Sequence, residues 1–146
     1  MNSPKVEIVI VEENPDDAEV MMRVLRKHSL ASEVAHVKDG VEALDLLLAQ
    51  GRCAQDTAQG APKVVLLDLK LPKGDGLEVL RRLKSDPRTR AIPVVVLTSS
   101  AEERDLRDAY ALGANSYVAK PVRREELAKI VLELGLYWLK INRLPA

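Results

Sequence analysis

Acidic side chains directly follow two apolar segments of this sequence, at 6–11 and 64–67. Glu12 and Glu13 come after the first segment and Asp68 after the second. If these segments are neighbouring strands of a parallel sheet, the carboxylates lie together at its carboxyl edge, where ligands of such sheets bind. Converging carboxylates repel one another, and a divalent cation such as Mg²⁺ or Mn²⁺ would offset that repulsion. The pattern predicts a metal site in which Asp68 can act as a nucleophile toward phosphorus.

Two later segments end in side chains that can bind phosphate oxygens. Thr98 follows the run IPVVVL, and Lys120 follows SYVA. At the same sheet edge, their hydroxyl and ammonium groups would meet an acyl phosphate formed on Asp68. Taken singly, Thr98 is better explained as a helix cap and Lys120 as a surface lysine. The complete set favours a phosphoryl site.

Five apolar, β-rich runs alternate with segments of helical spacing, which is typical of a parallel α/β sheet. The right-handed crossover rule favours a flavodoxin-like, doubly wound five-stranded sheet of order 2-1-3-4-5, with five helices and an extended last helix. In that order the first and third strands are neighbours, so Glu12, Glu13 and Asp68 meet. The predicted strands are Val6–Val11, Glu33–Val37, Val64–Leu67, Ile92–Leu97 and Ser116–Ala119.

Helix boundaries follow from capping residues, glycines and prolines. Asn14 is expected to cap the first helix, with Asp16 and Asp17 in its first turn complementing the helix dipole. The polar segment 50–61 is expected to be a mobile connection. The other helices are expected after Gly40 with Val41 buried, after Gly76 and ending before Pro87, between Ala101 and Gly113, and after Pro121.

The composition limits the classes of function. At 146 residues the chain is expected to be one domain, with a core at about 5–131 and a helical extension at about 132–146. Lys+Arg and Asp+Glu both number 22, so the basic excess that drives nucleic-acid binding is missing. No apolar run approaches the ~20 residues of a membrane span, and we expect a cytoplasmic protein with no membrane partner. The single cysteine, Cys53, excludes an internal disulfide.

The segments VIVEENPDDAE, VVLLDLKLPKGDGLEVL, IPVVVLTSS and GANSYVAKP together resemble the receiver domain of two-component response regulators, in order and spacing over almost the whole chain. The resemblance implies that Asp68 accepts a phosphoryl group from a histidine kinase. It also implies signalling through a protein-binding face formed by the fourth helix, fifth strand and fifth helix, and not metabolic catalysis. The implied metal ligands are Glu12, Glu13, Asp68 and the Lys70 carbonyl; Lys120 is the phosphoryl contact, Thr98 and Tyr117 are the switch pair, and Lys70 and Ser100 tune dephosphorylation.

Four details qualify this resemblance. The Lys120–Pro121 bond is expected to be the cis peptide of the family, which would aim the lysine inward. Glu13 replaces the usual aspartate and is one methylene longer, which would alter metal affinity. The side chain of Lys70 is expected to impede hydrolysis of the acyl phosphate. Tyr117 is equally well explained as a switch or as sheet packing.

The C-terminal segment carries apolar residues that include Leu134, Tyr137 and Trp138. These side chains either fold back on the core or form a self-association surface, and we favour self-association. With the long connection before the third strand, this ending resembles stand-alone regulators of bacterial phytochrome histidine kinases. That subfamily implies a homodimer through the fourth helix, fifth strand, fifth helix and C-terminal extension.

Other functions have weaker support. A phosphatase of the haloacid dehalogenase type would need an aspartate at the position of Lys70. A nucleotide-binding module would need a glycine-rich loop after the first strand, where EENPDD stands. His28 and His36 have no matching partners and are expected to be structural or exposed. A phosphorylation-independent dimerisation or adaptor module remains the alternative to a working receiver.

Overall fold

The computed structural model describes residues 6–30, 33–56, 62–72 and 75–144 of the chain. Within these residues, five parallel strands form one sheet in the order β2-β1-β3-β4-β5. The flavodoxin-like order predicted from the sequence is confirmed, and β1 and β3 are neighbours along their whole length. The strands are β1 (Ile8–Val11), β2 (Val34–Val37), β3 (Val64–Leu67), β4 (Val94–Thr98) and β5 (Ser116–Ala119).

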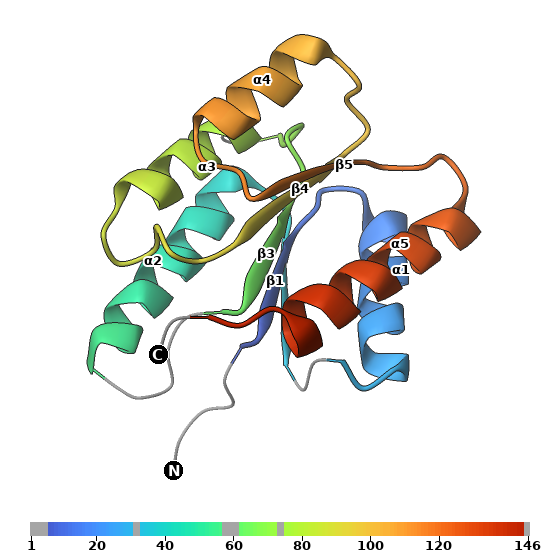
Figure 1. The fold of residues 1–146 in the computed structure, drawn as a ribbon, viewed down its shortest axis with the longest axis horizontal. Coiled ribbons are helices and arrows are strands. Elements are labelled where there is room, and N and C mark those ends of the chain that lie inside the picture. Colours follow the sequence, from blue (N-terminus) through green and yellow to red (C-terminus); the bar gives the residue numbers. More distant parts are fainter. Residues whose placement is uncertain (1–5, 31–32, 57–61, 73–74, 145–146) are drawn as a thin grey trace.

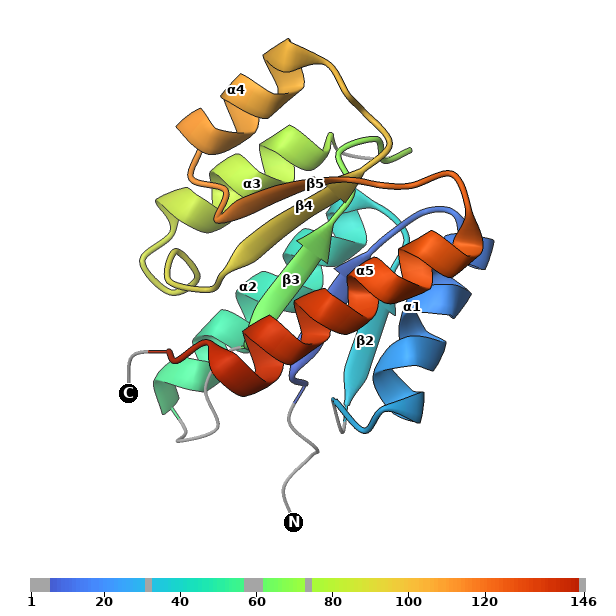
Figure 2. The same ribbon diagram turned by 45° about the vertical axis from the view of Figure 1, so that its right-hand side comes forward.

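Helices cover both faces of the sheet. In Figures 1 and 2, α1 and α5 lie together on one face, and α2 and α3 lie on the other. The helices are α1 (Pro15–Lys27), α2 (Gly40–Asp56), α3 (Gly76–Ser85), α4 (Glu103–Ala111), α5 (Arg124–Gly135) and a terminal π-helical segment, η1 (Leu136–Ile141).

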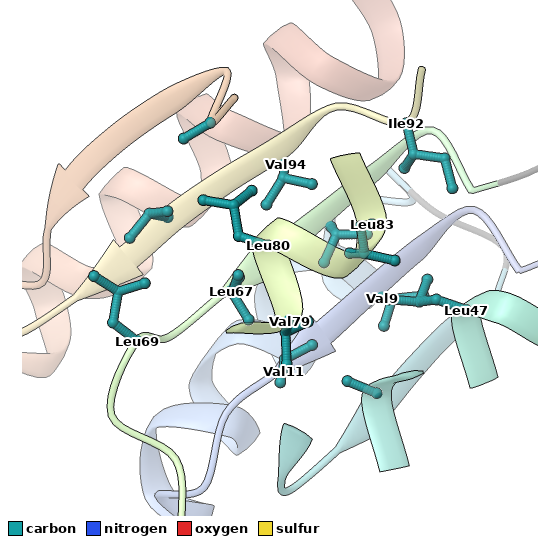
Figure 3. Close-up of a cluster of buried hydrophobic side chains, with 14 of the residues drawn as sticks. Val9, Val11, Leu47, Leu67, Leu69, Val79, Leu80, Leu83, Ile92 and Val94 are labelled. Carbon is teal, nitrogen blue, oxygen red and sulfur yellow. The ribbon is translucent and has the colours of Figure 1, made fainter. Parts of the chain in front are cut away.

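Each face of the sheet has its own apolar core because strand side chains alternate between the faces. Val9, Val11 and Leu67 point toward α2 and α3, where they meet Leu47 and Leu80 in the cluster of Figure 3. The intervening residues of the same strands pack against α1 and α5. The central strands β1, β3 and β4 are buried throughout, which explains their continuous apolar sequences.

The second helix is longer than the sequence indicated. It continues to Asp56, so the expected connection beginning at Gln50 is wrong for residues 50–56. Arginine, alanine and glutamine in this stretch favour helix, and Gly51 opposes it by only about 1 kcal/mol. Residues 57–61 lie outside the described residues. Val41, which was expected to be buried, lies in the first turn of α2 and is 54% exposed.

The C-terminal extension packs partly on the protein itself. A Cβ at Gly135 would lie 3.0 Å from Leu25 Cδ2 of α1 and 2.8 Å from Leu30 Cδ1, so this glycine lets the end of α5 approach α1 closely. Leu139 is buried and Trp138 packs beside it. Tyr137, although its ring meets the Trp138 ring edge-on with centroids 5.0 Å apart, remains exposed. The extension therefore combines a side that folds back on the core with an exposed apolar side.

Candidate functional site

Strand alternation selects which side chains meet at the carboxyl edge. Ile10 of β1 and Leu66 of β3 face the α1 and α5 side. One further alternation places Glu12 and Asp68 on that same side. Lys120 follows β5 in the same way, and its backbone N–H is fixed by a hydrogen bond to a β4 carbonyl. Three predicted site residues therefore converge between the sheet edge and the start of α1.

The ammonium of Lys120 lies at the centre of this group. Its Nζ is 2.8 Å from Glu12 Oε1, 3.2 Å from Asp68 Oδ2 and 3.1 Å from Asp17 Oδ2. An ammonium has three N–H donors, so the three carboxylates satisfy it fully. The side chain of Lys120 is 9% exposed and that of Glu12 is 1% exposed, so these charges are largely shielded from water.

The pKa values in this group reflect burial and an excess of negative charge. Burial raises the pKa of Glu12 from 4.5 to about 7, against the lowering effect of the hydrogen bonds from Lys120 and Asn14. Burial alone would lower the pKa of Lys120, but the hydrogen bond to Glu12 and the charges of Asp68 and Glu12 raise it above its ordinary value. Positive charge is therefore strongly favoured at this position.

Asp68 is held on both of its carboxylate oxygens. Oδ1 accepts hydrogen bonds from Thr98 Oγ1 at 2.8 Å and from the Lys70 backbone N–H at 3.1 Å, while Oδ2 faces Lys120. Gly76 packs closely against the loop that follows β3, and only a glycine fits there because a Cβ would lie 2.5 Å from the Asp68 carbonyl oxygen. The nucleophile predicted from the sequence is thus buried, oriented and within reach of both Thr98 and Lys120.

Glu13 and the side chain of Lys70 are exposed at the rim of this group. Both contribute to an open cavity of about 400 Å³. No ion pair between Lys70 and Glu13 is present among the described residues. The cavity is lined by Glu12, Glu13, Asn14, Asp17, Asp68, Lys70, Ser99, Lys120, Pro121 and Val122.

The oxygen donors fit a hard divalent cation such as Mg²⁺ or Mn²⁺. Glu12 and Asp68 present carboxylate oxygens to one common point, the Lys120 ammonium, and Glu13 borders the same cavity. Within the part of the chain that the structure describes, no ready-made cluster of three metal-ligating side chains is found. The carboxylates of Glu12, Asp17 and Asp68 are instead arranged around the Lys120 ammonium, a cation at the centre of the group.

Ser100 lies in the loop between β4 and α4, and Tyr117 of β5 contacts that loop. The Tyr117 hydroxyl donates to the Ser100 carbonyl at 3.1 Å, and burial raises the pKa of Tyr117. The buried Ser100 hydroxyl donates to Asp105 in the first turn of α4 and accepts from the Glu102 N–H. Ser100, which was expected to tune dephosphorylation, thus contacts the start of α4, whereas its neighbour Ser99 borders the cavity.

Two features of the site differ from the sequence predictions. The Lys120–Pro121 peptide is trans, as are all peptide bonds of the described residues, so the expected cis bond is wrong. Lys120 reaches the carboxylates through its long side chain, and trans is the more stable form of such bonds. Asp17 was missed as a site residue because its place in the first turn of α1 was explained by the helix dipole. The signal was available, since that turn abuts the strand edge.

The two histidines lie outside the carboxylate group around Lys120. His28 is exposed, and Nε2 of His36 donates to the Glu12 carbonyl at 2.8 Å, so the prediction of structural or exposed histidines is confirmed. None of the helices that the structure describes is long and apolar enough to span a membrane.

Several known proteins are similar to this chain in sequence. The family model of the response regulator receiver domain matches residues 8–132. FilR2 of Methanothrix harundinacea, a probable methanogenesis regulatory protein, is 44% identical over 94% of this chain and 86% of its own. The response regulator Rcp1 of Synechocystis is 38% identical over 99% of this chain and 96% of its own.

Three solved structures of response regulators are similar to this chain over nearly its whole length. The phosphorylated cyanobacterial phytochrome response regulator RcpA is 38% identical with a TM-score of 0.86, covering 98% of this chain and 100% of its own. Mn²⁺-bound Rcp1 is 38% identical with a TM-score of 0.85 and the same coverage. The bacteriophytochrome response regulator AtBRR is 48% identical with a TM-score of 0.67, covering 96% of this chain and 100% of its own.

Proposed function

The chain belongs to the response regulator receiver domain family, and from that membership we propose that it accepts a phosphoryl group from a histidine kinase on Asp68. The supporting observation is the environment of Asp68, a buried carboxylate that faces both the Thr98 hydroxyl and the Lys120 ammonium. These groups can bind phosphoryl oxygens as charge develops on them in the transition state.

In the proposed transfer, a carboxylate oxygen of Asp68 forms a bond to phosphorus while the P–N bond of phosphohistidine breaks. The electron pair of that bond returns to the imidazole nitrogen, which takes up a proton. Glu12, Glu13, Asp68 and the Lys70 carbonyl would hold the Mg²⁺ or Mn²⁺ ion. When bound, the ion would neutralise the phosphoryl oxygens. Lys120 would bind one of these oxygens, and Thr98 would move toward another.

The proposed output is a change in a protein-binding face. Thr98 donates a hydrogen bond to Asp68. Tyr117 donates a hydrogen bond to the carbonyl of Ser100, which lies two residues after Thr98. Movement of Thr98 toward a phosphoryl group would therefore alter the β4–α4 loop and the face made by α4, β5 and α5. We propose that this face and the exposed side of the C-terminal extension form a homodimer, and that the chain is not a metabolic enzyme.

The proposed kinase is a bacteriophytochrome. Support comes from the relatives that are phytochrome or bacteriophytochrome response regulators, over nearly the full length of this chain. Phosphotransfer from purified candidate kinases, timed over seconds, would test this assignment. A bacteriophytochrome that transfers no faster than an unrelated histidine kinase would argue against it.

The first test is labelling with acetyl phosphate in Mg²⁺, followed by size-exclusion chromatography with light scattering. Asp68→Asn should abolish the gain of one phosphoryl mass, while Asp45→Asn, an exposed aspartate on α2, should label like the wild type. A phosphate-dependent change in mass or elution would support the switch. A wild type that is not modified would leave the adaptor alternative, and a dimer unaffected by labelling would favour constitutive assembly.

A further inference from the structure

Asp17 contacts Lys120 from helix α1 and not from a strand end. It lies in the first turn of α1, and its backbone N–H donates to the side chain of the capping residue Asn14 at 3.1 Å. This cap fixes the turn, so the Asp17 carboxylate is held 3.1 Å from Lys120 Nζ. The α1 residue Asp17 thus contacts the ammonium of Lys120, which follows β5.

We propose that Asp17 is a positioning residue that retains the Lys120 ammonium in the pocket when Mg²⁺ engages Glu12 and Asp68. This inference rests on the metal-dependent function proposed above. In the structure, Glu12, Asp68 and Asp17 share the three N–H donors of Lys120. A cation bound by Glu12 and Asp68 would compete for two of these acceptors and repel the ammonium. Asp17 remains as its acceptor.

Burial makes this acceptor necessary. The Lys120 side chain is 9% exposed, so an ammonium that lost its carboxylates there would be neither paired nor well hydrated. Asp17 is 22% exposed, so its carboxylate contacts both water and Lys120. An ammonium held beside Asp17 stays close to Asp68, where it can contact a phosphoryl group.

The preceding residue provides a matched control. Asp16 lies in the same helical turn and carries the same charge, but it pairs with Arg124 at 3.2 Å on the surface. Asp16→Asn and Asp17→Asn therefore change the net charge and the helix dipole equally. They differ in whether the lost carboxylate contacts Lys120.

The experiment measures the Mg²⁺ dissociation constant by isothermal titration calorimetry for the wild type, Asp16→Asn, Asp17→Asn and Asp17→Glu. Asp17→Asn should raise the constant by about three- to tenfold, the range expected for losing one partly buried charge pair. Asp16→Asn should stay within about twofold, since surface pairs contribute little, and Asp17→Glu should recover part of the loss. Circular dichroism checks that each variant is folded.

A double-mutant cycle with Lys120→Met, or with Lys120→Gln if that variant is unfolded, separates positioning from a direct charge effect. If Asp17 acts through Lys120, Asp17→Asn should have no effect on Mg²⁺ binding when Lys120 is replaced. A full effect in that background would overturn the proposal, as would equal effects of Asp16→Asn and Asp17→Asn or a wild type that binds no Mg²⁺. Binding of Mg²⁺ without labelling of Asp68 would overturn only the proposed function. The double-mutant cycle would still test whether Asp17 acts through Lys120.

Discussion

The Tyr117 hydroxyl donates a hydrogen bond to the backbone carbonyl of Ser100 at 3.1 Å. This bond joins β5 to the loop that begins immediately after Thr98. The same serine binds Asp105 and the Glu102 N–H through its hydroxyl. Ser100 therefore connects the end of β4, the ring of Tyr117 and the first turn of α4.

Tyr117→Phe should loosen this loop without preventing labelling of Asp68, because the lost hydroxyl contacts the loop and not the carboxylate. We expect faster amide hydrogen exchange at residues 100–103 and a loss of stability of about 0.5–1.5 kcal/mol, typical of one hydrogen bond. Tyr110→Phe on the exposed side of α4 is the control. Unchanged exchange in the loop, or loss of acetyl phosphate labelling, would contradict this role.

Mg²⁺ affinity should increase with pH because Glu12 must lose its proton to bind a cation. With a pKa raised to about 7, this carboxyl is mostly protonated at pH 6 and mostly ionised at pH 8. The Mg²⁺ dissociation constant should fall by about tenfold over this range, measured by calorimetry. Glu12→Gln should bind weakly and without this dependence; a wild-type constant equal at both pH values would exclude Glu12 as the group responsible.

The same shift affects the stability of the metal-free protein. The folded state binds the Glu12 proton more tightly than the unfolded state, so the contribution of this group is greatest below pH 4.5 and is lost as the pH rises to about 7. Glu12→Gln should remove this component from urea unfolding curves recorded across that range.

Lys70→Ala should shorten the lifetime of the phosphorylated protein. The exposed Lys70 side chain borders the cavity that contains Asp68, where its charge can cover a phosphoryl group and hinder water. We expect dephosphorylation to accelerate by about three- to tenfold, consistent with one weak electrostatic contact. Lys140→Ala, an exposed lysine on η1, should not change the rate. An unchanged rate for Lys70→Ala would show that the side chain does not protect the acyl phosphate.

The two sides of the C-terminal extension should respond differently to truncation. Leu139 is 6% exposed, so Leu139→Ala should lower the free energy of unfolding by about 2–4 kcal/mol. Tyr137 is 47% exposed, so Tyr137→Ala should leave stability nearly unchanged and weaken self-association. Urea unfolding and light scattering measure the two effects. A dimer unaffected by Tyr137→Ala would place its interface elsewhere.

Much of the fold could be predicted because local patterns and topology agree. The apolar run at β3 stops at Asp68, and the Asn14 cap starts α1 where expected. The parallel order then brought Glu12, Asp68 and Lys120 to one edge, as the distances now show. Strand alternation and crossover handedness hold for parallel α/β sheets in general, so they can be applied to a single sequence.

The remaining differences depend on tertiary packing. Asp17 was explained by the helix dipole alone; the expected position of its turn at the strand edge hinted at a site role, but its contact with Lys120 depends on how α1 packs beside β5. The trans bond before Pro121 shows that side-chain length can aim Lys120 inward by itself. The division of the extension into buried Leu139 and exposed Tyr137 depends on the close approach permitted by Gly135.

The contact between Glu12 and Lys120 joins residues 108 positions apart. Closing so long a loop has a high entropic cost before the sheet is formed, so we expect this pair to assemble late in folding. During synthesis, Asp68 leaves the ribosome well before the lysine that completes its pocket. A nascent or partly unfolded chain would therefore lack the complete pocket of the proposed phosphoryl acceptor, which would restrict the proposed signalling to fully folded molecules.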